Sequence, residues 1–436
     1  MRTMLRLLSA LLVWLAAQSA AAAQPQEPMA AYQVVAGDTL IALAGRYMEQ
    51  PSDYLLVQQL NGVADPRRLQ PGTVLQIPVR LLRGAPVAAR IAAFRGQVTI
   101  TGRGGDRAAR VGASVGEGAL ITTGPNAFVT VELADGSRVS LPSQSRIRVE
   151  RLRRLRLTGE IHRVFRLEDG RSTSVVTPTP DARGRFIITT PVTVAAVRGT
   201  EFRVGYDQEA GRATLGVVEG HVADRALGEA AETMVPATFG RTSDATGGGA
   251  PEPLLPAPRL IDPQREQSER QVRLRTTAVE GAGAYRAQLA TDPDFIDVFA
   301  EQRSRTPDFV FEGLENGHYF VRFTALTPGG LEGLPAAYGV GRWLNAVDLL
   351  APEQTSAGLD FRWRASGAGE ALYRFQLSAQ PDMSSPLVDV DNLSEARFGL
   401  AAPPAGVYYW RVFVRRFDER QISETWSSVQ RLQIGR

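Results

Sequence analysis

The stretch TPVTVAAVRGTEFRV, Thr190–Val204, decides the fold of the central part of this chain. Apolar and β-branched residues dominate both sides of Gly199, as is typical of buried β-strands. Glycine adopts backbone conformations that other residues avoid, so Gly199 predicts a bend between two such strands.

The same period-two pattern continues outward from this stretch. Phe128–Leu133 and Arg138–Leu141 alternate between apolar and polar residues, with the turn sequence Asp135-Gly136 between them. Alternating runs on either side of Asp-Gly are a hairpin signal. Similar runs recur from Ala89 onward, so we predict an all-β domain over residues 88–245.

Several motifs give this β domain a family resemblance. GASVGEG at 112–118, LADGS at 133–137 and VVEG at 217–220 accompany the opening stretch. In this combination the region resembles the FecR domain of periplasmic signalling and cell-envelope proteins. In sensory members of that family, a cytoplasmic anti-sigma segment and a transmembrane helix precede the domain. Neither is found before it here, so the resemblance implies the periplasmic domain and its fold, and not transmembrane signalling.

A smaller module is predicted over residues 30–80. Tyr32–Val35 alternates as a short strand, and Asp38 or Thr39 can cap a helix that begins at Leu40. Pro51 opens a second helix, for which we expect Tyr54, Leu55, Val57 and Leu60 to form the buried face. Residues 74–78 make a closing strand, which gives a βααβ unit.

The module resembles the LysM family through YQVVAGDTL at 32–40, LN at 60–61 and LQPGTVLQIP at 69–78. LysM domains bind N-acetylglucosamine-containing glycans such as peptidoglycan. The resemblance places the groove between two loops, on Gly37, Asp38, Thr39, Leu40, Asn61, Gly62, Leu69, Gln70 and Pro71. The alternative is that Asp38, Thr39 and Asn61 serve only as caps and turn residues.

The C-terminal part contains an internal duplication. AYRAQL at 284–289 recurs as LYRFQL at 372–377, and GHYFVR at 317–322 recurs as GVYYWR at 406–411. We predict a Gly/Pro-rich linker at 246–256 and two β-sandwiches at 257–346 and 347–436. They resemble fibronectin type III domains, and we expect the tryptophans of the second one, Trp426 included, to belong to its core.

The first residues have the order of a secretory signal peptide. A short basic start is followed by the apolar run 7–17 and by Ala21-Ala22-Ala23, an A-x-A cleavage pattern. We expect cleavage near Ala23, export to the periplasm and no transmembrane segment in the mature chain. An uncleaved anchor is the alternative, for which the run is short.

Composition excludes several kinds of chemistry. All 49 basic residues are arginine, and the chain has no lysine and no cysteine. Lysine-dependent phosphate loops and Schiff bases are therefore absent, as are thiol nucleophiles and thiolate metal sites. The three histidines are scattered, without H-x-H or H-E-x-x-H. A glycosidase that uses carboxylates alone stays open by residue type. Since every long segment is already explained as a binding or β module, we expect no enzymatic activity, no cofactor and no metal.

Positive charge is concentrated in one segment. Loss of Arg2 and Arg6 with the signal peptide would leave 49 − 2 = 47 arginines against 46 acidic residues. Residues 146–171 nevertheless hold nine arginines against four carboxylates. A solvated strand face is the simplest interpretation. The alternative is an anion-binding strip for acidic wall polymers, lipopolysaccharide or an acidic partner, on Arg146, Arg148, Arg151, Arg153, Arg154 and Arg156. Aromatic residues for base stacking are scarce here, which disfavours nucleic acid.

The sequence as a whole predicts a multidomain, mainly β protein. The favoured function is a non-catalytic periplasmic scaffold that binds peptidoglycan through the LysM-like module and presents its β domains to an envelope protein partner. The alternative is an envelope signalling or stress-sensing component that acts through the FecR-like domain. A wall hydrolase is a third and weaker interpretation.

Overall fold

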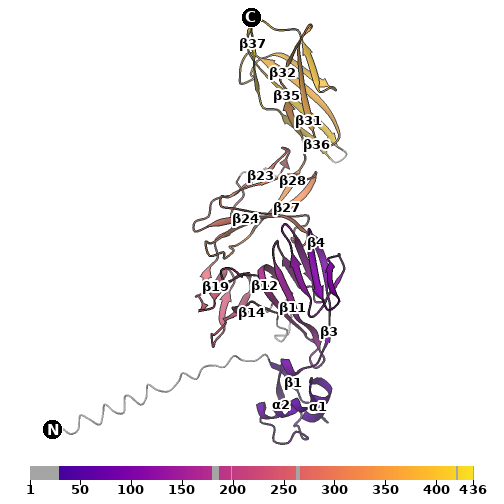
Figure 1. The fold of residues 1–436 in the computed structure, drawn as a ribbon, viewed down its shortest axis with the longest axis vertical. Coiled ribbons are helices and arrows are strands. Elements are labelled where there is room, and N and C mark those ends of the chain that lie inside the picture. The colour runs from indigo at the N-terminus through magenta and orange to yellow at the C-terminus, as the bar shows by residue number, and fades with distance from the viewer. Residues whose placement is uncertain (1–28, 179–185, 198, 262–265, 419–420, 436) are drawn as a thin grey trace, which may run out of the picture. The chain divides into compact units, whose positions relative to one another are not determined.

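The computed structural model describes residues 29–178, 186–197, 199–261, 266–418 and 421–435 (Figure 1). The expected signal peptide, residues 1–23, lies outside the described residues. The chain divides into two compact units between Leu254 and Leu255. The mainly β fold class is confirmed, and each unit is described separately below.

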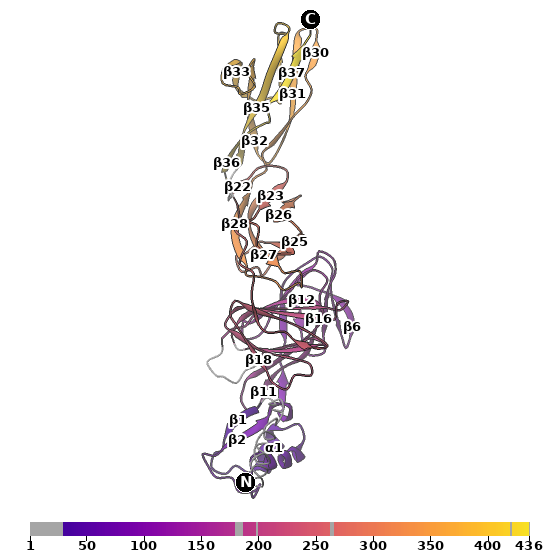
Figure 2. The same cartoon turned by 90° about the vertical axis from the view of Figure 1, so that its left-hand side faces the viewer.

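The first unit begins with the small module, which has the βααβ order. Its elements are β1 (Met29–Gln33), α1 (Leu40–Tyr47), the 3-10 turn η1 (Pro51–Asp53), α2 (Tyr54–Leu60) and β2 (Val74–Pro78). Strands β1 and β2 pair antiparallel, with Met29 opposite Pro78, and lie beside the helices (Figure 2). The Ala42 amide donates to Thr39 Oγ1 (3.0 Å), so Thr39 caps α1.

The expected buried face of α2 is wrong in two positions. Val57 is buried, but the side chains of Leu55 and Leu60 are 57% and 48% exposed. Leu55 lies two residues from Val57, and 100° per residue puts it on almost the opposite side of the helix. The Val57 side faces β2, which leaves a row of leucines at the surface.

The small module shares its core with the β domain that follows. Beyond β2, Leu81 and Leu82 join the module's buried cluster, and Leu155 enters it from the end of strand β11 (Arg146–Leu155). Backbone bonds reinforce this contact, since the Arg83 amide donates to the Tyr47 carbonyl (2.7 Å). The connection between the two domains is therefore a packed interface.

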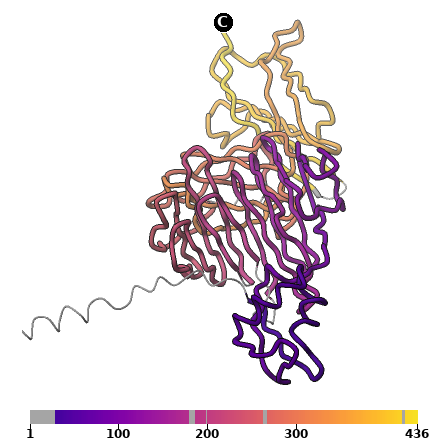
Figure 3. Tube along the Cα trace, turned by 60° about the horizontal axis from the view of Figure 1, so that its bottom comes forward, coloured from indigo at the N-terminus to yellow at the C-terminus, as the bar shows by residue number. Residues whose placement is uncertain are grey.

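The central domain has two facing sheets that close into a flattened barrel (Figure 3). One sheet holds β3 (Gly84–Pro86), β5 (Val98–Gly102), β6 (Gly105–Ala108), β8 (Leu120–Thr123), β11, β12 (Ile161–Val175), β13 (Phe186–Thr189), β14 (Thr193–Val197), β17 (His221–Ala226) and β18 (Thr233–Pro236). The β12–β13 pair is parallel, whereas the other pairs in this sheet are antiparallel.

The second sheet holds β4 (Ala89–Arg95), β7 (Ser114–Val115), β9 (Phe128–Glu132), β10 (Arg138–Leu141), the distal half of β12, β15 (Glu201–Asp207), β16 (Arg212–Glu219) and β19 (Phe239–Asp244). The proximal half of β12 pairs with β11 and its distal half with β10 and β15. Phe165 and Phe186 stack, with ring centroids 5.3 Å apart, and Phe202 meets Phe186 edge to face at 6.0 Å.

The opening stretch forms β14 and β15 with Gly199 between them. Its φ is +66°, and a Cβ there would lie 2.7 Å from Pro178 Cα, so only glycine fits without strain. The segment 246–256, expected to be a linker, is paired for part of its length. Strands β20 (Gly247–Gly248) and β21 (Glu252–Pro253) both pair with β19, because small residues and an edge strand allow this chain to return along the sheet.

The second unit contains two β-sandwiches. The first has a five-stranded sheet of β22 (Glu266–Gln267), β28 (Ala336–Arg342), β27 (Gly317–Leu326), β24 (Ala284–Ala290) and β25 (Val298–Ser304), against β23 (Val272–Arg275) and β26 (Asp308–Phe311). The second has β33 (Pro386–Leu393), β32 (Glu370–Ser378), β35 (Gly406–Asp418), β36 (Gln421–Trp426) and β37 (Gln430–Ile434), against β29 (Ala346–Leu349), β31 (Gly358–Ser366), β30 (Glu353–Thr355) and β34 (Arg397–Leu400).

The aromatic core expected for the second sandwich is confirmed in part. Trp363 and Trp410 are buried in its cluster. Trp426 is 36% exposed, because it lies opposite Phe413, on the face of β35 that points away from the core. This outer face is considered again below.

The shared core predicts that the small module and the central domain lose stability together. Leu155→Ala removes a buried side chain that reaches the small module's core from a strand of the central domain, and we expect it to lower the free energy of unfolding by about 2–4 kcal/mol. It should also make residues near 79–84 a site of limited proteolysis in the native protein. Urea unfolding and proteolytic mapping of the mature chain measure both effects.

Leu227→Ala, at an exposed leucine of the same domain, is the matched control and should change neither property. If Leu155→Ala left both the stability and the cleavage pattern at wild-type values, the packed interface would be contradicted.

Candidate functional site

The two loops predicted to form a glycan groove lie against each other. The Leu40 amide, at the end of the first loop, donates to the carbonyl of Pro66 in the second (2.8 Å). At the far side, the Val34 amide donates to the Thr73 carbonyl (2.8 Å). These backbone bonds join the first strand–helix loop to the second helix–strand loop, so the predicted residues are brought into one region.

Three of the predicted residues are used within the first loop itself. Asp38 Oδ2 accepts from the Tyr32 hydroxyl (2.8 Å) and from the Val35 amide (2.9 Å). Burial raises the pKa of Tyr32 to about 12, and the Asp38 carboxylate contributes to the same rise, so the Tyr32 hydroxyl stays a donor. Thr39 caps α1, and Leu40 is fully buried. These side chains shape the loop.

Asn61 fastens the second loop. Its Nδ2 donates to the carbonyls of Val57 (2.8 Å) and Gln76 (2.9 Å), and its Oδ1 accepts from the Gln76 amide (2.7 Å). Three of the four hydrogen bonds that an asparagine amide can make are thus spent inside the module. Gly62 follows with φ +60°, which ends α2 in the left-handed region.

The remaining predicted residues form the accessible part of the loops. Gly37, Gly62, Gln70 and Pro71 are exposed, and Leu69 is half-buried. A ligand that docks here would therefore meet backbone groups together with Gln70 and Pro71, on a framework held by Asp38 and Asn61.

The predicted arginine strip is divided by its own ion pairs. Arg146 and Arg148 both bind Glu168, at 2.8 Å each. Further along β11, Arg153 makes a bidentate bond to Glu117, with Nε 2.7 Å from Oε1 and Nη2 2.6 Å from Oε2, and lies 3.3 Å from Glu49. The hydrogen bonds from Arg153 lower the pKa of the Glu117 carboxyl.

The rest of the strip faces solvent. Arg151, Arg154 and Arg156 are exposed, and Arg154 donates to the Gly159 carbonyl (2.8 Å). A β-bulge between Val149 and Arg151 separates Arg146 and Arg148 from the rest of the strip. The six arginines thus form an inner, carboxylate-bound group and an outer, solvated group.

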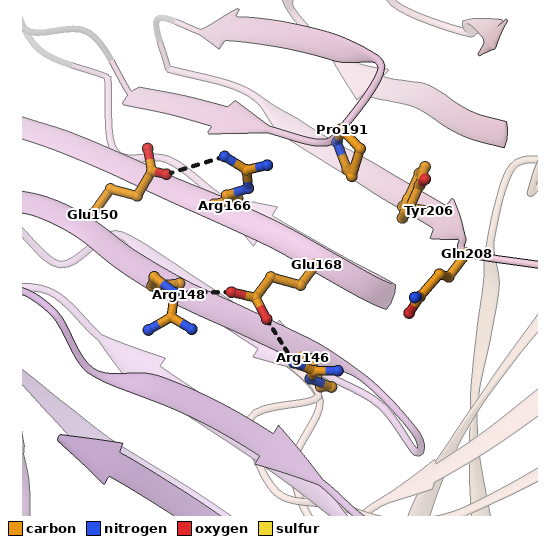
Figure 4. Close-up of a pocket in the computed structure, with 8 residues that line it drawn as sticks. All are labelled: Arg146, Arg148, Glu150, Arg166, Glu168, Pro191, Tyr206 and Gln208. Carbon is orange, nitrogen blue, oxygen red and sulfur yellow. Dashed lines mark hydrogen bonds and ion pairs between the residues drawn. The ribbon is translucent and has the colours of Figure 1, made fainter. Parts of the chain in front are cut away.

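The first part of the strip lines a pocket with a volume of about 420 Å³ (Figure 4). Its eight lining residues come from β11, β12, β15 and the turns beside them: Arg146, Arg148, Glu150, Arg166, Glu168, Pro191, Tyr206 and Gln208. Arg148 and Arg166 lie directly opposite each other on β11 and β12. Glu168 neutralises the first, whereas Arg166 meets Glu150 only at 3.8 Å. Three guanidinium groups against two carboxylates leave the pocket with an excess of positive charge.

Only Arg146 and Arg148 of the eight lining residues were predicted from the sequence. Glu150, Arg166 and Glu168 lie within the charged segment but were not predicted as site residues, and Pro191, Tyr206 and Gln208 are far away in the sequence. The cross-strand register could have identified Arg166, since strands joined by a short turn place their outward residues side by side. Nothing local could have identified Tyr206, which reaches the pocket because β15 pairs with β12.

Asn61 is predicted to hold the second loop in place. Asn61→Ala removes three hydrogen bonds and leaves the Gln76 amide and carbonyl without this partner, so we expect a loss of about 2–3 kcal/mol in unfolding free energy. Urea unfolding of the mature chain checks this. Gln70→Ala, in the same loop, should stay within about 0.5 kcal/mol of wild type. Equal stability of the two variants would contradict the role of Asn61 in holding the second loop.

His162, on β12, predicts a pH-dependent stability. Burial, followed by the nearby charges of Arg151 and Arg153, lowers its pKa to about 4 in the folded protein, from about 6.5 in the unfolded chain. The unfolded chain therefore binds the extra proton between these values. The stabilising contribution is complete above pH 6.5 and is lost as the pH falls towards 4.

In urea unfolding, wild type should lose about 2–3 kcal/mol more than His162→Gln between pH 7 and pH 4. His221→Gln, at an exposed histidine, should follow the wild-type profile. Parallel profiles for wild type and His162→Gln would rule out the buried neutral imidazole.

No described helix is long and apolar enough to cross a membrane. Within the described ranges, no group of three or more histidine, aspartate or glutamate side chains has the arrangement of a metal site.

Comparison with known proteins places two domains in families. Residues 119–223 match the family model "FecR protein", and residues 32–78 match "LysM domain". No curated protein matches the chain. All eight residues that line the pocket of Figure 4 fall within the FecR match.

Among solved structures, a putative anti-sigma factor from Parabacteroides distasonis ATCC 8503 aligns over 31% of this chain at 20% identity, with a TM-score of 0.26. The alignment spans 59% of that protein. A two-domain fibronectin type III segment from chicken tenascin aligns over 42% of this chain and 99% of its own, at 15% identity and a TM-score of 0.19. The fibronectin(III)-like modules of Clostridium thermocellum CbhA align over 41% of this chain and 94% of their own, at 14% identity and a TM-score of 0.19. The family matches thus show that this chain carries a LysM domain and a FecR domain.

Proposed function

We propose that this protein is a non-catalytic periplasmic scaffold that binds peptidoglycan through its LysM domain and presents its FecR domain and sandwiches to protein partners. The LysM match supports glycan binding, and both matched families are binding or signalling domains. The proposal includes export by the signal peptide at residues 1–23 and binding on the loops that contain Gly37 and Gln70.

The observation that carries the proposal is the packed joint between the LysM and FecR domains. Leu155 belongs to the LysM cluster, although it lies on a strand of the FecR domain. Arg153 also connects Glu49 of the LysM domain to Glu117 of the FecR domain. A LysM domain on a loose linker would tether its cargo without orienting it. This joint would instead set the direction of the FecR domain relative to a bound glycan.

A second candidate function is envelope signalling through the FecR domain. The pocket of Figure 4 favours it, because mixed charge beside Tyr206 and Pro191 suits recognition of a polar partner group. Here the partner would be recognised by the FecR domain, and the LysM domain would hold this receptor at the wall.

The wall-binding prediction is tested with the mature chain, residues 24–436, and purified peptidoglycan sacculi. Deletion of residues 30–80 would expose Leu155, so point variants are the better choice. Gln70→Ala combined with Pro71→Ala removes two exposed side chains of the second loop that the groove prediction includes, without touching Asp38 or Asn61. We expect at least a fivefold loss of retention on sacculi, and competition of the wild-type protein by soluble N-acetylglucosamine oligomers.

Leu55→Ser, at an exposed position of α2, is the matched control and should be retained like wild type. Equal retention of the double variant and the wild type would remove the groove from the proposal. Clearing of peptidoglycan in a zymogram would overturn its non-catalytic part.

A further inference from the structure

The two sandwiches carry the same row of polar side chains on the outer face of their larger sheet. In the first, Glu301 Oε2 accepts from Arg286 Nη2 (2.6 Å) and from Gln288 Nε2 (2.9 Å), and Gln288 Oε1 accepts from Arg322 Nη2 (2.7 Å). The row crosses three strands, from β25 through β24 to β27. We call it the first ladder.

The second sandwich repeats this row with an aspartate in place of the glutamate. Asp389 accepts from Arg374 through both oxygens (2.7 and 2.6 Å) and from Gln376 Nε2 (3.0 Å), and Gln376 Oε1 accepts from Arg411 Nε (2.9 Å). The register is the same, because Gln376 lies opposite Asp389 on one side and Arg411 on the other. This is the second ladder.

The backbone beside the ladders is duplicated as well. Phe295 follows β24 with φ +55°, and Met383 follows β32 with φ +58°, an unusual conformation for such side chains. The two repeats can therefore be compared position by position.

The chain itself covers the first ladder. Glu332, in the loop between β27 and β28, places its Oε1 and Oε2 at 3.1 and 2.9 Å from Arg286 Nη1. Thr324 donates to the same carboxylate (2.9 Å), and Leu331 beside it is buried. Under this cover the Arg286 side chain is only 3% exposed. Two carboxylates thus share one buried guanidinium. Burial by itself would lower the pKa of Arg286, but the two carboxylates outweigh it and raise that pKa.

The second ladder has no such cover in the described part of the chain. Phe413 occupies the position of Thr324, opposite Arg374. From Phe413 onward, β35 pairs with β36 and both strands stay within the sheet. Asp389 is the one carboxylate that pairs with Arg374 among the described residues, and the Arg374 side chain is 39% exposed. Its Nε and Nη2 groups bind Asp389, and among the described residues no hydrogen bond uses its Nη1 group, which holds Glu332 in the equivalent arginine.

Aromatic side chains lie next to this arginine. Trp426 packs against Phe413, with ring centroids 5.0 Å apart, and the Arg411 guanidinium lies 4.0 Å above the Trp426 ring. Trp426 is 36% exposed, although tryptophan is a residue that proteins normally bury or place in interfaces. The face therefore offers a cationic donor beside an apolar surface.

We propose that this outer face of the second sandwich binds an acidic peptide segment of a partner protein. A carboxylate of the partner would bind Arg374 as Glu332 binds Arg286, and an apolar neighbour would pack on Phe413 and Trp426. The ion pairs of the two equivalent arginines differ. Arg286 is shared by Glu301 and Glu332, whereas Arg374 pairs with Asp389 alone among the described residues.

The internal copy is what favours a peptide over a glycan or a lipid surface. In the first sandwich the ligand of the ladder arginine is a glutamate side chain on a loop, with a leucine before it. An acidic peptide segment could bind the guanidinium of Arg374 in the arrangement that Glu332 has with Arg286. This inference does not depend on wall binding, since the LysM groove lies in the other compact unit.

The test uses the loop itself as a probe. A peptide with the sequence of residues 327–335, TPGGLEGLP, is added to the mature chain, and the indole N–H signal of Trp426 is followed by NMR. We expect saturable shifts. The same peptide with Glu332→Gln should bind at least about fivefold more weakly, because the charge-assisted bond is lost. Arg374→Gln in the protein should weaken the wild-type peptide equally and abolish the difference between the two peptides.

Arg397→Gln, at an exposed arginine on the opposite sheet, is the matched control and should bind like wild type. Circular dichroism and the remaining indole signals report whether each variant is folded. Equal shifts with both peptides, or no shift at millimolar peptide, would overturn the proposal. A Trp426 response to N-acetylglucosamine oligomers without a response to the peptide would also overturn it in favour of a glycan surface.

Discussion

Strand β12 runs through both layers of the FecR domain, and the rest of the first unit depends on the bend that allows this. Its first half pairs with β11 and its second half with β10 and β15. Gly170 lies between the halves with φ +80°, and a Cβ there would stand 2.4 Å from the Gln144 carbonyl oxygen. No other residue fits this place without moving the backbone. The bend therefore fixes how the two sheets face each other.

Both candidate sites of the first unit follow from this strand. Arg166 and Glu168 on β12 form the floor of the pocket, and the pairing with β15 brings Tyr206 to its edge. The partner strand β11 ends in Leu155, which packs into the LysM core. One strand pair thus connects the pocket with the LysM domain.

Because the chain has no lysine, the basic partner in its ion pairs with carboxylates is arginine wherever it is not histidine. A guanidinium group offers five donors in a fixed plane, so it can hold one or two carboxylates with defined geometry. Arg153 does so at the LysM–FecR joint, and Arg286 does so on the first sandwich. Such arginines organise neighbouring strands, so a count of positive charge overstates what is available to a ligand. Half of the predicted anion strip is occupied in this way.

The sequence by itself determined the order of the modules, their mainly β class and the duplication of the sandwiches, because periodicity, turn residues and repeats are local properties. It also located the two loops of the LysM domain. Only the tertiary structure decided that the Asn61 side chain bonds to the Gln76 backbone and that Leu155 packs in the LysM core. The same holds for Trp426, which lies outside the core of its own sandwich. Each of these depends on which strands pair and in what register, and a contact between distant strands leaves no pattern in either segment alone.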